Sequence, residues 1–154
     1  MINTDKPGQI LVINGPNLNL LGTREPEIYG DTALIEIESE ILTIAEKEKV
    51  KVEFFQSNHE GEIIDKIQAA RDSADFIIIN PAALGHYSIA LYDVLKAVDI
   101  PFIEVHLSNI YAREPFRQKS LLSPIASGII AGLGSYGYKM AFLAACHLIK
   151  NHQA

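Results

Sequence analysis

The chain has 154 residues, of which 48% are apolar and 21% are charged. This length is typical of one domain, and this composition excludes a disordered chain. The formal net charge of −6 excludes a general binder of nucleic acid or of anionic membranes, because such proteins present a basic face.

The amino-terminal segment and the cysteine content both favour a cytoplasmic chain. Residues 1–9 are polar and lack the long apolar stretch of a signal peptide or a membrane span. Cys146 is the only cysteine, so no intrachain disulfide can form, and its apolar helical neighbours indicate a buried, unreactive thiol. We therefore expect a cytoplasmic protein with one domain that spans residues 1–154.

Five short apolar runs predict buried strands, at residues 10–13, 50–55, 76–79, 102–105 and 128–131. Apolar residues at helical spacing lie between the first four runs and again after the last. Asp31 or Thr32 is suited to cap the first helix. Strands that alternate with helices predict a parallel sheet covered on both faces through right-handed crossovers. We expect an α/β protein, a flavodoxin-like three-layer sandwich with a five-stranded parallel sheet in the order 2-1-3-4-5.

Polar residues follow three of these strands. Asn14 and Asn17 follow the first strand, Asn80 follows the third, and His106 and Ser108 follow the fourth. A doubly wound sheet binds its ligands beyond the carboxyl ends of its strands, at the switch point between strands 1 and 3. We therefore expect the functional site at this edge of the sheet.

The connection at residues 17–30 joins the first strand to the first helix and is too long for a plain turn. Its length is compatible with a lid. Arg24 and Tyr29 are five residues apart, close enough for the guanidinium to approach the phenol. A nearby positive charge favours the tyrosinate, which would make Tyr29 a base. The alternative is that Tyr29 packs on the domain and Arg24 is solvated.

Residues 80–88 join the third strand to its helix through a turn of small residues. One interpretation is that Ser88 caps the helix and His86 is a surface histidine. It leaves Asn80 and His86 unexplained at a predicted ligand-binding edge. We therefore favour substrate contacts from Asn80 and His86.

His106 follows the fourth apolar run, and Glu104 lies two residues earlier on the same face of the strand. A carboxylate beside an imidazole holds one tautomer and stabilises the charged form, as a proton-transferring histidine requires. A solvated histidine at a strand end is the alternative. A zinc site is disfavoured because no second histidine lies at local ligand spacing, so we expect no metal.

Residues 112–119 carry three positive charges, two of them on Arg113 and Arg117, against one negative charge. In an acidic chain this predicts a local anion site, since the fork of an arginine suits a carboxylate. The alternative is a charged loop that is only solvated.

The glycines at residues 132–137 match the dinucleotide pattern G-x-G-x-x-G. We reject that interpretation, because the pattern needs a further βαβ unit with an acidic residue and only 17 residues follow Gly137. The glycines are expected to allow a tight turn and close helix packing.

Several segments together carry a specific resemblance to one known family. They are INGPNLN at 13–19, REP at 24–26 with YG at 29–30, QSNHEG at 56–61 and IEVHLSN at 103–109. SPIA at 123–126, Gly128 and GLG at 132–134 continue the match. In these segments, and in their order along nearly the whole chain, the sequence resembles the type II 3-dehydroquinate dehydratases.

The resemblance implies a flavodoxin-like catalytic domain that assembles as a homododecamer and needs no cofactor. It implies a hydro-lyase of the shikimate or quinate pathway, which converts 3-dehydroquinate to 3-dehydroshikimate by anti elimination of water through an enolate. Tyr29 would be the tyrosinate base, activated by Arg24. His106, oriented by Glu104, would be the general acid, and Asn17 would hold a water molecule at the enolate.

The resemblance also implies further residues that meet the substrate. Arg113 would close over the site and Asp93 would reach the site of a neighbouring subunit. The other implied contacts come from Asn80, His86, Leu107, Ser108 and Arg117.

The chain departs from the family pattern at three positions near these residues. Gly85 and Tyr87 flank His86 where threonines are usual, and Tyr92 replaces the arginine that usually precedes Asp93. The departures put in question the packing around His86 and the contacts between subunits. A second hypothesis is a flavodoxin-like protein that binds an anion in the same pocket without turnover. It leaves a base and acid pair unexplained.

Overall fold

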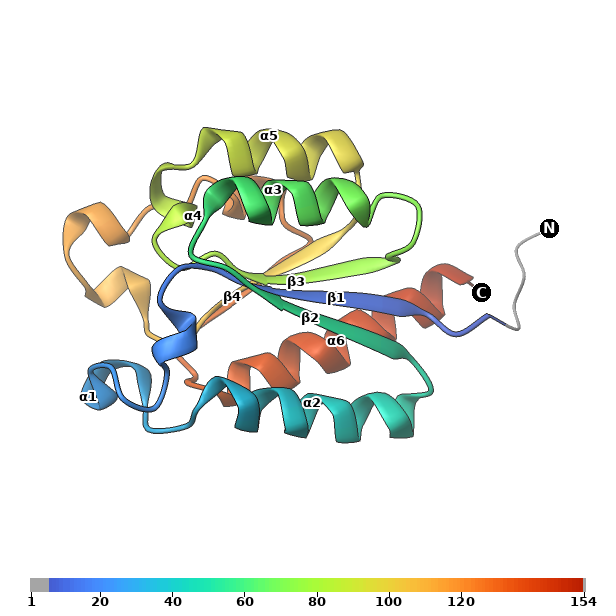
Figure 1. Cartoon of the computed structure of the whole chain (residues 1–154), viewed down its shortest axis with the longest axis horizontal. Coiled ribbons are helices and arrows are strands. Elements are labelled where there is room, and N and C mark those ends of the chain that lie inside the picture. The colour runs from blue at the N-terminus through green and yellow to red at the C-terminus, as the bar shows by residue number, and fades with distance from the viewer. Residues whose placement is uncertain (1–5, 154) are drawn as a thin grey trace.

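The computed structural model describes residues 6–153 and has a central sheet with helices on both faces (Figure 1). The strands are β1 (Gln9–Asn14), β2 (Lys51–Gln56), β3 (Phe76–Asn80), β4 (Phe102–His106) and β5 (Gly128–Ala131). The long helices are α2 (Leu34–Glu48), α3 (Glu60–Ala69), α5 (Ile89–Val98) and α6 (Tyr136–Gln153). Single helical turns form α1 (Pro26–Tyr29) and α4 (Leu84–Tyr87), and short 3-10 turns are η1 (Leu18–Leu20), η2 (Ile110–Ala112), η3 (Pro115–Arg117) and η4 (Ser123–Ile125).

All five strands are parallel and lie in the order β2-β1-β3-β4-β5. Helices α2 and α6 cover one face of the sheet, and α3 and α5 cover the other (Figure 1). The predicted flavodoxin-like sandwich is therefore confirmed. Strand β4 runs one residue further than predicted, so that His106 is part of the sheet.

Alternate strand residues pack into two cores, one on each face of the sheet. Ile10 and Val12 of β1 pack with α2 and α6, whereas Leu11 and Ile13 pack with α3 and α5. Burial on both faces explains why the strands read as almost continuous apolar runs. Cys146 lies in the core under α6, and its burial raises the pKa of the thiol to about 11, so the thiol is protonated and unreactive as expected.

The start of helix α2 differs from the prediction. The helix begins at Leu34, so neither Asp31 nor Thr32 caps it. Instead, the carboxylate of Glu36 accepts a hydrogen bond of 2.7 Å from the backbone N–H of Ala33. The hydrogen bond from Ala33 to Glu36 thus satisfies the backbone at the start of the helix, where the sequence predicts a cap by Asp31 or Thr32.

The glycine-rich turn before α6 has the structural role that the sequence indicates. Gly132 has a φ of +88°, and a Cβ there would lie 3.2 Å from the Cβ of Asn109. A Cβ on Gly137 would lie 3.2 Å from the side chain of Ile130, so α6 packs closely on β5. Within residues 6–153, no helix is both long and apolar enough to cross a membrane.

Candidate active site

A cleft lies at the carboxyl ends of β1, β3 and β4, where the sequence predicts the site. Its free volume is about 50 Å³, which is room for only a few water molecules. All but two of the predicted site residues line it, namely Asn17, Arg24, Tyr29, Asn80, His86, His106, Leu107, Ser108, Arg113 and Arg117. The turns α1 and α4 lie at this same end of the sheet (Figure 1).

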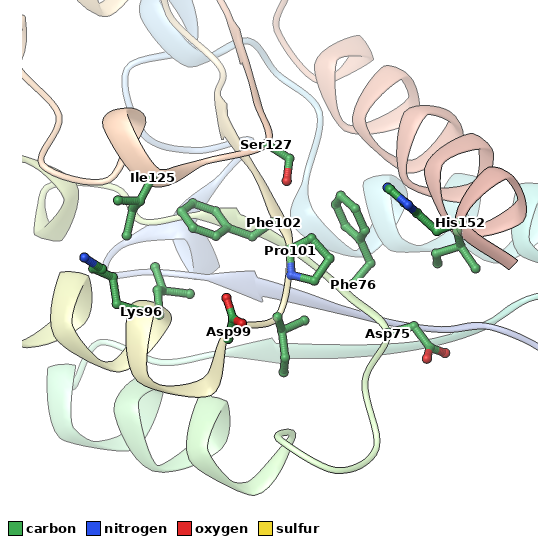
Figure 2. A pocket seen from close by; sticks show the side chains of 12 residues that line it. Asp75, Phe76, Lys96, Asp99, Pro101, Phe102, Ile125, Ser127 and His152 are labelled. Carbon is green, nitrogen blue, oxygen red and sulfur yellow. The ribbon is translucent and has the colours of Figure 1, made fainter. Parts of the chain in front are cut away.

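A larger hollow of about 630 Å³ lies at the opposite end of the sheet, where the strands begin (Figure 2). Its lining includes Phe76 and Phe102, the first residues of β3 and β4, whereas Asn80 and His106 are the last residues of those strands. Ligands of doubly wound sheets bind beyond the carboxyl ends of the strands. We therefore assign the candidate site to the smaller cleft.

Tyr29, the last residue of α1, lies beside two arginines. Nη1 of Arg113 donates a hydrogen bond of 2.9 Å to the phenol oxygen. The guanidinium carbon of Arg24 lies 4.7 Å from the ring centroid of Tyr29, and that of Arg113 lies 5.3 Å from it. Both arginines thus bring positive charge to the phenol. The sequence pointed to Arg24 alone, because Arg113 is 84 residues away along the chain.

His106 and Glu104 form a buried pair in which Nε2 of the imidazole lies 2.5 Å from Oε1 of the carboxylate. Ser123 Oγ donates a hydrogen bond of 2.6 Å to Oε2 of Glu104. Burial by itself raises the pKa of this carboxyl, but hydrogen bonds from His106, Ser120 and Ser123 outweigh it and leave the pKa below its ordinary value. Glu104 is therefore a carboxylate at neutral pH and accepts the Nε2 proton of His106. Nδ1 is the ring nitrogen left for the cleft.

His86 stacks on His106 instead of lying free on the surface. The two ring centroids are 6.2 Å apart and the ring planes differ by 16°. Nδ1 of His86 lies 2.8 Å from the carbonyl oxygen of Lys119, and because a carbonyl can only accept, Nδ1 carries the proton. This leaves Nε2 of His86 for a ligand. Ser88 caps α5 by accepting the N–H of Leu91, as the sequence indicates.

Asn17 follows β1 with a left-handed backbone, at a φ of 70°. Asn58 Oδ1 accepts its backbone N–H at 2.9 Å. Gln56, the last residue of β2, donates through Nε2 to that same oxygen and to the carbonyl of Gly15, both at 3.2 Å. A left-handed conformation is costly for most residues and is tolerated best by asparagine and aspartate. The end of β2 therefore holds the backbone of Asn17.

Asn80 is buried and its side-chain amide is already bound within the chain. Nδ2 donates to the hydroxyl of Tyr138 at 2.9 Å, and Oδ1 accepts from the N–H of Ala82 at 3.1 Å. The Tyr138 hydroxyl in turn donates to Oδ1 of Asn14 at 2.6 Å. Burial raises the pKa of Tyr138, so this tyrosine stays neutral and fixes the two asparagines at the ends of β1 and β3.

Arg113 and Arg117 lie in the segment that follows β4, where the sequence predicts an anion site. Oε2 of Glu114 lies 3.0 Å from Nε of Arg117 and 3.7 Å from Nε of Arg113. One carboxylate therefore holds two arginines that line the same cleft. Leu107 and Ser108, directly after β4, complete this side of the lining.

Asp93 lies outside the cleft, on α5, where it lines a separate hollow against α3. The expected contact with a neighbouring subunit involves a second chain and stays a prediction. Tyr92, the preceding residue of α5, is partly buried and packs against the core on this face of the sheet.

The backbone of Gly85 lies close to Pro81. A Cβ on Gly85 would lie only 2.8 Å from Cγ of Pro81, which explains why a small residue stands at this departure from the family pattern.

The sequence does not predict several residues that support the site. Asn58 and Gln56 belong to a motif that carried the resemblance, but nothing in the sequence connects them to Asn17. Ser120 and Ser123 lie in a loop between the fourth and fifth strands, and only the fold brings them to Glu104. Among residues 6–153, no three or more His, Cys, Asp or Glu side chains cluster closely enough to hold a metal ion.

The fold and the cleft together define a class of protein. A flavodoxin-like sheet carries, at its strand ends, a phenol between two arginines and an imidazole bonded to a buried carboxylate. A sheet with such a cleft at its strand ends is typical of an α/β enzyme. The chain belongs to the family described as dehydroquinase class II, whose sequence profile matches residues 8–146.

Known proteins of this family are similar over nearly the whole chain. The 3-dehydroquinate dehydratase of Polynucleobacter asymbioticus is 59% identical over 141 residues, which are 91% of this chain and 95% of that protein. The catabolic 3-dehydroquinase of Penicillium rubens is 58% identical over 137 residues, 89% of this chain and 88% of that one. The crystal structure of the type II dehydroquinase from Butyrivibrio crossotus superposes with a TM-score of 0.88 at 48% identity, and the match covers 90% of this chain and 97% of that one.

Proposed function

We propose that this chain is a 3-dehydroquinate dehydratase, a hydro-lyase of the shikimate or quinate pathway that forms 3-dehydroshikimate. The observation that carries the proposal is the contact of Tyr29 with Arg24 and Arg113 in the cleft that His106 also lines. Relatives that carry this activity in their names share more than half of the sequence.

The first proposed step is removal of a proton from C2 of the substrate by Tyr29 as a tyrosinate. The guanidinium groups of Arg24 and Arg113 favour the ionised phenol through their positive charge. The C2–H bond breaks, the proton passes to the phenolate oxygen, and the electron pair moves into an enolate. Asn17 would hold a water molecule that stabilises the enolate oxygen, and its backbone is already fixed by Asn58.

The second proposed step is loss of the hydroxyl group from C1. The enolate electrons form the new carbon–carbon double bond while His106, as an imidazolium, gives its Nδ1 proton to the departing hydroxyl, which leaves as water. Glu104 supports this role because its buried negative charge, 2.5 Å from Nε2, stabilises the imidazolium and orients the ring. The elimination is anti, so the base and the acid act from opposite sides of the substrate ring.

Substrate binding is proposed to use the remaining residues of the cleft. Arg117 would meet the carboxylate of the substrate through its guanidinium fork. Arg113 lines the cleft and is bonded to Tyr29, and it would close over the bound substrate. The remaining contacts would come from Asn80, His86, Leu107 and Ser108.

We further propose that the chain, a single catalytic domain over residues 1–154, works in the cytoplasm as a homododecamer. Large apolar side chains stand exposed on two parts of the surface, with Ile35 and Leu143 on α2 and α6, and Tyr87 and Ile89 beside the cap of α5. Such side chains favour burial between subunits. Asp93 of one subunit would then reach the site of its neighbour. Sedimentation of the protein as a monomer would contradict this assembly.

The activity is tested by adding purified protein to 3-dehydroquinate and following ultraviolet absorbance. We expect absorbance to rise as the conjugated product forms, before and after dialysis against a chelator, because the proposed steps use protein groups alone. Borohydride with substrate should leave the activity unchanged. Inactivation by borohydride would point to a lysine imine and reject the proposed chemistry, and binding of 3-dehydroquinate without turnover would favour an anion-binding protein.

A further inference from the structure

One loop segment, residues 119–123, is bonded directly to the imidazole of His86 and, through Glu104, indirectly to that of His106. The carbonyl of Lys119 accepts from Nδ1 of His86 at 2.8 Å. Four residues later, Ser123 Oγ donates at 2.6 Å to the carboxylate of Glu104, whose other oxygen lies 2.5 Å from Nε2 of His106. Since the two imidazole rings stack on each other, this one segment orients both members of the stack.

The segment is itself fixed by internal hydrogen bonds. Ser120 is buried, and its hydroxyl oxygen accepts from the backbone N–H of Leu122 at 3.1 Å and of Ser123 at 3.4 Å. The N–H of Leu121 donates to the carbonyl of Gly85 at 2.8 Å, which ties the segment to the turn that carries His86. Ser123 is therefore held in position in front of Glu104.

The charge on Glu104 decides which proton His106 carries. A carboxylate can only accept, so it binds the Nε2–H tautomer and leaves Nδ1 for the cleft. A neutral carboxyl group would donate to Nε2 and force the proton onto Nδ1. Because Glu104 is fully buried, it depends on nearby donors to remain charged, and the two serines are such donors.

We propose that Ser123, supported by Ser120, is a positioning residue that fixes Glu104 as an oriented carboxylate and thereby sets the tautomer and orientation of His106. The inference rests on the proposed function, in which His106 donates the proton that leaves with water. Ser123 does not line the cleft, so it acts through Glu104 and not on the substrate.

The test compares the full-length protein with three variants, labelled with ¹⁵N-histidine. Ser123→Ala removes the hydroxyl and Ser123→Thr keeps it. Ser127→Ala is the matched control, because Ser127 is an exposed serine of the same loop that lines the hollow at the amino ends of the strands (Figure 2). Long-range ¹H–¹⁵N spectra report the tautomer of each imidazole, and His106 is assigned from the signal that His106→Asn removes. We expect neutral His106 to be the Nε2–H form in the wild type, in Ser123→Thr and in Ser127→Ala. We expect a mixture with the Nδ1–H form in Ser123→Ala.

Kinetics with 3-dehydroquinate give the second readout. For Ser123→Ala we expect kcat to fall about tenfold, the size of one lost hydrogen bond to a charged group, with KM within about twofold of the wild type. Ser123→Thr should restore kcat. An unchanged His106 tautomer in Ser123→Ala would overturn the inference, and so would a threonine variant that behaves like the alanine variant. The spectra need no substrate, so a wild type inactive on 3-dehydroquinate would reject the proposed function alone.

Discussion

Replacing Glu104 by glutamine removes the negative charge behind His106 while keeping the size of the side chain. The carboxylate is 0% exposed and lies 2.5 Å from Nε2, so solvent does not screen the loss. A hydrogen bond to a charged group contributes about 1.5–3 kcal/mol. If that stabilisation of the imidazolium is lost, kcat falls roughly 10- to 150-fold at neutral pH.

The assay is the initial rate of absorbance increase with 3-dehydroquinate at neutral pH. The variant keeps the ring of His106, so a lower rate reports the lost charge of Glu104 and not the loss of the imidazole. Glu40→Gln is the matched control, because Glu40 is an exposed carboxylate paired with Lys139 at 3.5 Å. A Glu104→Gln variant with wild-type kcat would refute the reasoning.

The same substitution has a consequence for stability. The pKa of Glu104 in the folded chain lies below its ordinary value of 4.5, so its contribution is present above that pH and is lost as the pH falls through the lower, folded value. The unfolding free energy of the wild type should therefore exceed that of Glu104→Gln by less and less as the pH drops below about 4.5. Urea unfolding at several pH values measures this difference, and a gap that stays constant with pH would contradict it.

Two further substitutions test local arguments. Asn58→Ala removes the hydrogen bond to the backbone of Asn17, and we expect kcat to fall about fivefold, the value of one hydrogen bond of about 1 kcal/mol, with little change in KM. An unchanged kcat would contradict the role of Asn58. Gly85→Ala forces a Cβ to 2.8 Å from Pro81 and should cost about 1–3 kcal/mol of unfolding free energy, whereas Gly61→Ala, with open space around its Cβ, should cost nothing. Equal unfolding free energies for the two variants would reject the steric argument.

The sheet and its covering helices were predictable because each strand and each long helix has a local signature. The strands are apolar runs buried on both faces, and the helices repeat apolar residues at their own period, so the alternation alone indicates a parallel sheet. The exception is the cap of α2, where Glu36 binds the backbone of Ala33 from within the helix. The sequence pattern offers Asp31 and Thr32 as caps, but the helix begins at Leu34, too late for either residue to cap it.

The site was predictable to the extent that its residues lie at strand ends. Asn80 and His106 end β3 and β4, so the switch-point rule brings them together without any three-dimensional information. The contacts of Arg113 with Tyr29 and of Ser123 with Glu104 join segments that are far apart in the chain. Loop geometry sets these contacts, and neither periodicity nor spacing in the sequence encodes it.

The central claim is that Tyr29 is the base that takes the substrate proton, and the most direct test is the turnover of Tyr29→Phe. The variant keeps the ring beside Arg24 and loses only the hydroxyl that Arg113 bonds. We expect 3-dehydroquinate to bind with an affinity close to that of the wild type, measured by calorimetry, while turnover falls below detection. Substantial turnover by Tyr29→Phe would contradict the account.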